Sequence, residues 1–177
     1  MNDILRAFDG YLTNLNLRFH AVVIGGAALI TMGIIKRTTK DVDCLDPDIP
    51  DPVKQASKIF ALEHPNLGLD ENWLNNGPAS LKADLPVGWQ DQLIQLFSGV
   101  AVELYTLGRL DLLRTKLFAY CDRQQDEDDC AALLPTLDEL RICLPWLLER
   151  DGNPYWPENV KAALRQLAKR LGYEYNP

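Results

Sequence analysis

The chain has 177 residues, of which 47% are hydrophobic and 24% are charged, and its net charge is −7. This is the composition of a globular protein with one sizeable core, or a core and a smaller lobe, and no apolar run approaches the roughly 20 residues of a membrane span. Because binding to a nucleic-acid backbone requires lysine and arginine at the phosphates, the acidic balance disfavours a long nucleic-acid footprint.

The four cysteines are scattered without a C-x-x-C pair, and the two histidines lie far apart. This spacing predicts neither a zinc site nor a disulfide framework, and the N-terminal residues lack the layout of a signal peptide. We therefore expect a cytoplasmic protein with reduced thiols and no membrane partner.

The first half of the chain carries signals for both helices and strands. In chain order, the pattern predicts a helix over 2–16, a buried strand over 19–24, a short helix over 27–35, a half-buried strand over 41–45 and a helix over 51–63. Prolines and the tetrapeptide NNGP mark turns over 64–90, where a short helix is expected near 71–74. The segments QLIQLF and VAVELYT then predict a β-hairpin that turns at Ser98 and Gly99.

Helical patterns follow from residue 109 onward. They cover 109–122, 126–134, 136–149 and 157–171. The predicted fold class is α/β (α+β), with a short mixed sheet flanked by helices. We expect two domains, an α/β core over 1–108 and a helical C-terminal lobe over 109–177.

Two adjacent glycines, Gly25 and Gly26, connect the first predicted strand to the short helix that follows. Glycine allows a phosphate group to approach the backbone closely, and the unpaired N–H groups and the dipole at a helix N-terminus attract the anion. Glycine pairs are also common in tight turns that bind nothing. The pair alone therefore leaves a phosphate-binding role and a purely structural role open.

Two acids, Asp41 and Asp43, lie one residue apart in the next predicted strand. Alternate residues of a strand project from the same face, so the two carboxylates are expected side by side, with Val42 and Cys44 packed on the other face. Such carboxylates repel each other unless a cation lies between them, and Mg²⁺ is bound by one or two protein carboxylates together with phosphate oxygens. The pair predicts a Mg²⁺ site for a nucleoside triphosphate, and the alternative is an exposed strand with alternating acids.

The string GGAALITMGIIKRTTKDVD, residues 25–43, resembles the opening motif of the minimal nucleotidyltransferase superfamily. In that motif a Gly-Gly or Gly-Ser turn and a short helix precede R-x-T-x-D-x-D. The string is most similar to the branch that holds the abortive-infection toxin nucleotidyltransferases and related bacterial proteins. The resemblance implies that Asp41 and Asp43 are catalytic residues that bind Mg²⁺. It also implies a set of nucleotide-binding residues, namely Gly25, Gly26, Arg37 and Thr39.

A second segment, DLLRTKLFAYCDRQQDEDDCAAL at residues 111–133, resembles the family's downstream K-x-x-A…R…D-x-x-D segment. The resemblance implies that Lys116 and Arg123 bind the triphosphate. It also implies that Asp126 is a general base or a third metal contact. Asp129 is the second acid of the D-x-x-D pair.

The spacing of this segment has a physical meaning of its own. Lys116, Tyr120 and Arg123 share one face of the predicted helix, and cations there would neutralise the charge of a triphosphate. The alternative is that these cations pair with the acids at 126–129. Asp129 falls on the same face as Leu133, which is the inward side of its own helix.

Many nucleotidyltransferases carry a third carboxylate on a neighbouring strand, and Glu103 is the candidate here. An unpaired charge in the middle of an apolar strand would be costly, although an edge strand with a solvated glutamate is the alternative. Asp126 and Asp129 are also candidates for the third carboxylate. Trp73 and Trp89 are candidates to stack on a nucleotide base, although tryptophan is more common in cores and interfaces.

The resemblance implies a helical lobe that closes one side of a cleft and a Mg²⁺-dependent transfer of a nucleoside monophosphate from an NTP to a hydroxyl acceptor. The protein would be the toxin of a toxin–antitoxin or phage-defence pair, with a protein partner encoded nearby. The acceptor is open among tRNA, a protein and a small molecule. A tRNA acceptor would need a basic surface, for which Lys161, Arg165 and Lys169 at helical spacing are the best candidates.

Two departures from the family's pattern favour another function. Gly26 stands where many active members carry serine, and Gln125 replaces the usual basic residue before the second acid motif. The first change removes a hydroxyl that could contact a phosphate, and the second removes a positive charge. They favour a nucleotidyltransferase-like binding or interaction protein with weak or no catalysis.

Overall fold

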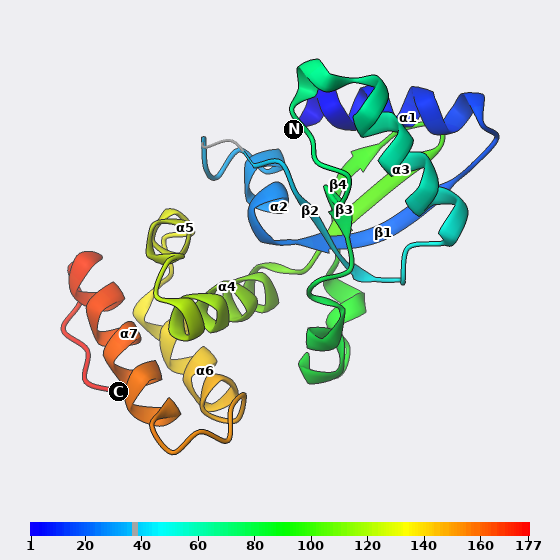
Figure 1. Cartoon of the computed structure of the whole chain (residues 1–177). Helices are drawn as coiled ribbons and strands as arrows, with labels where there is room; N and C mark the ends of the chain where they lie inside the picture. The colour runs from blue at the N-terminus through cyan, green and yellow to red at the C-terminus, as the bar shows by residue number, and fades with distance from the viewer. Residues whose placement is uncertain (37–38) are drawn as a thin grey trace. The chain divides into compact units, whose positions relative to one another are not determined.

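The described residues, 1–36 and 39–177 of the computed structural model, divide into two units, Met1–Gly108 and Arg109–Pro177. The first unit is mixed α/β and the second is helical (Figure 1). The predicted fold class, a mixed sheet with flanking helices followed by a helical C-terminal part, is confirmed.

A five-stranded sheet in the order β3-β2-β1-β5-β4 forms the centre of the first unit. Its strands are β1 (Phe19–Ile24), β2 (Val42–Asp46), β3 (Leu74–Asn75), β4 (Ile94–Ser98) and β5 (Val102–Thr106). The central strand β1 pairs antiparallel with β2 and parallel with β5. β3 runs parallel to β2, and β4 runs antiparallel to β5, as the predicted hairpin requires.

Two helices, α1 (Asn2–Asn14) and α3 (Asp51–Glu63), lie side by side over one face of this sheet (Figure 1). Phe8 of α1, Phe60 of α3 and Trp73 meet there, with ring centroids 5.0 to 6.0 Å apart. Alternate residues of the strands, including Val42 and Cys44, complete this core. The other face of the sheet is consequently the one that carries the polar strand residues.

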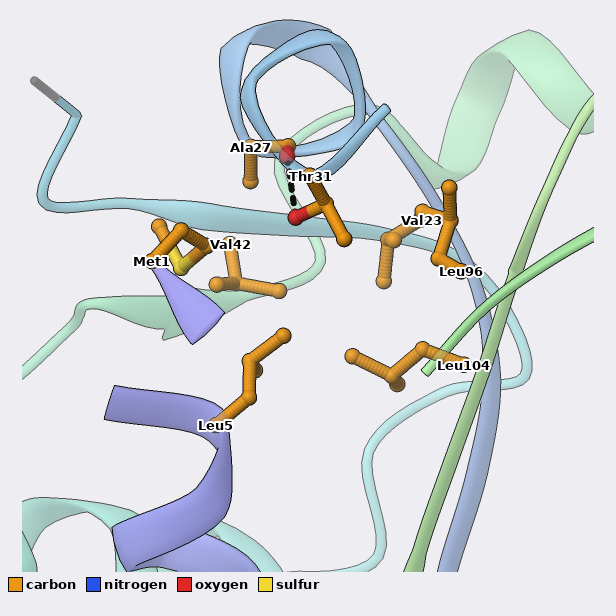
Figure 2. Close-up of a pocket in the computed structure, with 8 residues that line it drawn as sticks. All are labelled: Met1, Leu5, Val23, Ala27, Thr31, Val42, Leu96 and Leu104. Carbon is orange, nitrogen blue, oxygen red and sulfur yellow. Dashed lines mark hydrogen bonds between the residues drawn. The ribbon is translucent and has the colours of Figure 1, made fainter. Parts of the chain in front are cut away.

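The short helix α2 (Gly25–Thr31) begins directly at the end of β1. Figure 2 shows how it is held: Ala27 and Thr31 face Val23, Val42 and the N-terminal turn of α1 across a gap that leaves no room for a water molecule. The Thr31 hydroxyl donates to the Ala27 carbonyl oxygen at 2.8 Å, so its hydrogen bond is made within the helix. This packing fixes where the glycine turn lies relative to β2.

The segment between α3 and β4 departs from the predicted pattern. It contains three short 3₁₀ helices, η1 (Pro65–Leu67), η2 (Ala79–Asp84) and η3 (Trp89–Gln92). The short helix predicted near 71–74 is wrong, because the Trp73 carbonyl oxygen accepts a hydrogen bond from the Val42 N–H at 2.5 Å and the chain continues as β3. This pairing with β2 is a long-range contact.

The second unit consists of α4 (Arg109–Arg123), α5 (Glu127–Ala132), α6 (Leu137–Leu148) and α7 (Trp156–Arg170). Leucines from α4, α6 and α7, such as Leu117, Leu140 and Leu164, are fully buried in its core. Thr136 and Glu139 form a capping box that starts α6. Within the part of the chain that the structure describes, no helix combines the length and apolar character of a membrane span.

Candidate functional site

The acid pair lies at the start of β2, on the polar side of the sheet. Val42 and Cys44 are buried with 1% and 0% exposure, so Asp43 between them projects from the opposite face. Asp41 immediately precedes the strand and is exposed. The neighbouring strand β1 places Ile24, the last residue before the glycine turn, opposite Asp43.

The carboxylate of Asp43 lies between the glycine turn and the side chain of Asn75. Gly25 has a φ of +78°, and a Cβ atom built there would lie 2.7 Å from Asp43 Oδ2. On the other side, Asn75 Nδ2 donates to Asp43 Oδ1 at 3.1 Å. Asp43 therefore has one oxygen against the glycine turn and the other against an amide of β3.

The second carboxylate, Asp41, is in an electrostatically unfavourable place for a bare anion. Partial burial raises the pKa of Asp41, and the charges of Asp43 and Asp70 raise this pKa further. The cation of Lys40 opposes them by lowering the pKa. The charges of Asp43 and Asp70 thus disfavour a bare anion at Asp41, which favours a bound cation there.

The donor chemistry at this end of the sheet fits Mg²⁺. The available ligands are carboxylate oxygens on a strand, which is the ligand type that Mg²⁺ prefers. Within the described residues, no group of three or more His, Cys, Asp or Glu side chains is arranged to hold a metal ion by itself. A Mg²⁺ ion that takes two carboxylates here would complete its coordination with water and substrate phosphate oxygens.

Glu103, on β5, belongs to a separate polar network. His20 Nε2 lies 2.6 Å from Glu103 Oε2, and Gln95 Nε2 donates to Glu103 Oε1 at 3.1 Å. The Tyr105 hydroxyl donates to the same oxygen, and this hydrogen bond lowers the pKa of Glu103. Partial desolvation raises the pKa of Glu103, whereas the charge of His20 lowers it further. The network links β1, β5 and β4 across the polar face.

The register of the sheet separates Glu103 from the acid pair. Glu103 is paired with His20 on β1, whereas Asp43 is paired with Ile24, four positions further along the same strand. Four residues of a strand span about 13 Å, which is too far for two carboxylates to share one metal ion. The structure therefore gives no support to Glu103 as a third metal ligand. Its carboxylate is instead held by His20 and Gln95 on neighbouring strands and by Tyr105 on its own strand.

The second motif lies in the helical unit, where its cation is engaged. Lys116 Nζ lies 2.7 Å from Asp129 Oδ2 and 3.2 Å from Asp126 Oδ1. The side chains of Lys116 and Asp129 are only 6% and 5% exposed. Asp126 also accepts from Arg123 Nη2 at 2.9 Å, and Arg123 itself is largely exposed. In the structure, Lys116 and Arg123 therefore pair with acids of the 126–129 segment, which was one of the two interpretations that the sequence left open.

The remaining acids of α5 are bound in the same way. Gln166 Nε2 donates to Glu127 Oε2 at 2.6 Å, and Arg170 Nη2 lies 2.7 Å from Asp128 Oδ1. Lys116, Arg123, Asp126 and Asp129 form what we call the Lys116 cluster. Together with this cluster, the contacts of Glu127 and Asp128 connect α5 to α4 and α7. The acids of this segment stabilise the helical unit, and their roles as general base or metal contact stay predictions.

Of the other predicted site residues, Arg37 lies outside the described residues. Thr39 lies beside the acid pair, with its hydroxyl 3.5 Å from the Asp41 N–H. Trp73 and Trp89 are buried, at 0% and 5% exposure, and the indole N–H of Trp73 donates to the Ser57 carbonyl oxygen at 3.0 Å. Neither ring is available to stack on a base, so the two tryptophans are core residues.

Sequence reasoning missed Asn75, the residue that contacts Asp43. The tetrapeptide NNGP, residues 75–78, predicted only a turn, yet its two asparagines have different partners. Asn76 Oδ1 accepts from the Ile49 N–H at 2.8 Å, and Asn76 Nδ2 donates to the carbonyl oxygens of Cys44 and Pro47. Asn75 could not be identified from the sequence, because only the fold brings it close to the acid pair.

A comparison with protein families finds one whose description is "Nucleotidyltransferase of unknown function (DUF6036)", and its model matches residues 3–137. The matched range contains the glycine turn, the acid pair, Asn75 and the Lys116 cluster. No curated protein and no solved structure matched the chain in the corresponding searches.

Proposed function

The chain belongs to this nucleotidyltransferase family, and from that premise we propose that it is a Mg²⁺-dependent enzyme that transfers a nucleoside monophosphate from an NTP to a hydroxyl acceptor. In the reaction, the acceptor oxygen bonds to the α-phosphorus, pyrophosphate leaves and the acceptor hydroxyl releases its proton. Membership of the branch of abortive-infection toxins stays a prediction.

The observation that carries the proposal is the confinement of Asp43 between the glycine turn and Asn75, with Asp41 two residues before it in the chain. Asp41 and Asp43 would bind the ion, and Mg²⁺ would supply positive charge to the triphosphate oxygens when bound. Partial desolvation raises the pKa of Asp41 and the nearby charges of Asp43 and Asp70 raise it further, so a bound cation would relieve the repulsion on this carboxylate. Gly25 leaves the space beside Asp43 free of a side chain. Gly26 and Thr39 would line the phosphate path.

The acceptor is an open part of this proposal. A tRNA, a protein hydroxyl and a small molecule all provide the oxygen that the reaction needs. For tRNA the exposed Arg165 and Lys169 of α7, with the half-buried Lys161, would form the basic contact, and binding would be weak and salt-dependent. If the protein acts as a toxin, its activity would be controlled by a protein partner encoded nearby.

Thermal unfolding in the presence of Mg²⁺, NTP or both provides the test. Ligand at 100 times its Kd stabilises the folded state by about 2.7 kcal/mol, so the two together should raise the Tm by several degrees while each alone has little effect. Incubation with α-³²P-labelled NTPs and total tRNA, or with the protein alone, should then transfer label. An unchanged Tm with all four NTPs and no labelled product would disprove the proposal.

A second function is favoured by one observation in the helical unit. Lys116, the cation that the family resemblance assigns to the triphosphate, is buried and bound by two carboxylates. With Gly26 and Gln125, this contact supports a nucleotidyltransferase-like protein that binds nucleotide or a protein partner without catalysis. MgNTP would then raise the Tm, but no label would be transferred to any acceptor.

A further inference from the structure

Asn75 is placed beside the acid pair by the sheet itself. The two-residue strand β3 runs parallel to β2, and in its register Asn75 is the partner of Asp43. The Asn75 side chain is half-buried, and its Nδ2 atom donates to Asp43 Oδ1 at 3.1 Å. Position and contact are therefore fixed by the same strand pairing.

The orientation of the Asn75 amide is also fixed. The Gly77 N–H donates to Asn75 Oδ1 at 2.7 Å. A Cβ atom at position 77 would lie only 2.9 Å from that oxygen, so glycine is the residue that permits this contact. Because Oδ1 is occupied as an acceptor, the amide nitrogen must be the group that faces Asp43. Asn75 consequently presents its N–H donors to the Asp43 carboxylate.

We propose that Asn75 is the positioning residue of the metal site, holding the Asp43 carboxylate in the orientation that binds Mg²⁺. This inference rests on the proposed function. Oδ2 of Asp43 lies against Gly25 and Oδ1 against the Asn75 amide, so rotation of the carboxylate is restricted on both sides. Groups that orient a metal-binding carboxylate commonly change metal affinity by 10- to 100-fold when they are removed.

The chemistry of an amide suits this task. It donates a hydrogen bond without carrying a charge, so it leaves the negative charge of Asp41 and Asp43 available to a cation. A lysine at position 75 would compete with the metal, and an aspartate would add another repulsive charge. Asparagine is the side chain of matching length that avoids both.

Asn76 provides a matched control for Asn75. The two residues are adjacent and chemically identical, and both make side-chain hydrogen bonds. Asn76, however, holds the backbone of β2 and of the segment after it, through hydrogen bonds to Cys44, Pro47 and Ile49, and none of these three bonds involves a side chain of the acid pair. Replacing Asn76 should lower stability and leave metal binding unchanged.

The experiment is a calorimetric titration of the full chain with MgCl₂ in the presence of α,β-methylene-ATP, which cannot release pyrophosphate. The parent, Asn75→Ala and Asn76→Ala are compared, and urea unfolding without metal measures the stability of each. Asn75→Ala should weaken Mg²⁺ binding at least about 10-fold, whereas Asn76→Ala should stay within about 2-fold of the parent. Asn75→Ser, whose shorter hydroxyl cannot reach both partners, is used if Asn75→Ala does not fold.

The outcomes separate the inference from the proposed function. A parent that binds Mg²⁺ with an Asn75→Ala variant that binds equally well overturns the role of Asn75 and leaves the function intact. An equal loss of Mg²⁺ affinity in both asparagine variants would mean that Asn75 has only a structural role, and this result also overturns the inference. A parent that binds neither the metal nor the nucleotide overturns the proposed function, and the positioning role with it.

Discussion

Gly25 and Asp43 approach each other so closely that a Cβ atom at position 25 would lie 2.7 Å from Asp43 Oδ2. The backbone of Gly25 also has a φ of +78°, which residues with a side chain rarely adopt. Two separate constraints therefore act at one glycine, a local backbone conformation and a contact with an acid of the candidate metal site.

Replacing Gly25 by alanine should reveal both constraints. Gly25→Ala should lose about 1–2 kcal/mol of unfolding free energy from its positive φ, and at least about 10-fold in MgATP affinity from the displaced Asp43 carboxylate. Gly33→Ala is the control, because Gly33 has a φ of +74° but nothing within 4 Å of its Cβ position. Urea unfolding and calorimetry measure the two effects. Equal MgATP affinities in the two variants would mean that the turn has only a structural role.

Glu103 should matter for stability and not for metal binding. Glu103→Gln keeps the size of the side chain and removes the charge that His20 and Tyr105 contact. We expect a lower urea midpoint for this variant and a MgATP affinity within about 2-fold of the parent, because the register keeps Glu103 about 13 Å from Asp43 along the strand. A 10-fold loss of MgATP affinity with an unchanged fold would restore Glu103 as a site residue.

The buried Lys116 cluster should be a main source of stability in the helical unit. Lys116→Met removes the cation of a buried ion pair with Asp129, which costs about 3–5 kcal/mol. Arg123→Met is the control, because its pair with Asp126 is exposed on the arginine side and contributes less than about 1 kcal/mol. Urea unfolding gives both values. Similar small losses in the two variants would show that the Lys116 pair does not stabilise the fold.

Asp9 should make stability depend on pH. It accepts hydrogen bonds from the N–H groups of Val100, Ala101 and Val102, at 3.2, 2.8 and 2.8 Å. Partial burial raises the pKa of Asp9, but these three donors outweigh it and lower the pKa overall. A lowered pKa means that the stabilisation is complete above the unfolded value of about 3.9 and is lost as the pH falls through the folded value.

The measurement for Asp9 compares the parent with Asp9→Asn from pH 7 to pH 2.5. At pH 7 the variant should be less stable by about 1 kcal/mol, since a charged acceptor is lost. This difference should shrink as the pH falls below about 4, where the Asp9 carboxylate becomes protonated first in the unfolded chain and then, at lower pH, in the folded protein. A difference that stays constant over the whole range would contradict the proposed linkage.

The elements of the first unit that follow local rules could be predicted from sequence. The strand Phe19–Ile24 and the hairpin of β4 and β5 carry apolar and alternating patterns, and α3 carries a proline in its first turn. Asp41 and Asp43 were found because the spacing of two residues in a strand is itself the signal for a shared face. The family match adds that the opening motif indicates a nucleotidyltransferase.

Features that depend on long-range pairing could not be predicted. β3 has only two residues, too short for any periodicity, and it exists because Trp73 and Asn75 pair with β2. Glu103 was a reasonable candidate on its strand, but the register between β1 and β5 decides which residues share a level, and no local pattern encodes that register. The same limit left the partner of Lys116 undecided between a phosphate and the acids of α5.

The proposed metal-binding role of Asp41 and Asp43 can be measured through the MgATP-induced rise in Tm of a double variant. Asp41→Ala with Asp43→Ala is compared with Asp46→Ala with Asp48→Ala, which removes the same charge from the far end of β2 and the residues after it. We predict that the first variant folds and gains nothing from MgATP, while the second gains as much as the parent. A full MgATP-induced rise in the Asp41 and Asp43 double variant would show that these two acids do not hold the metal.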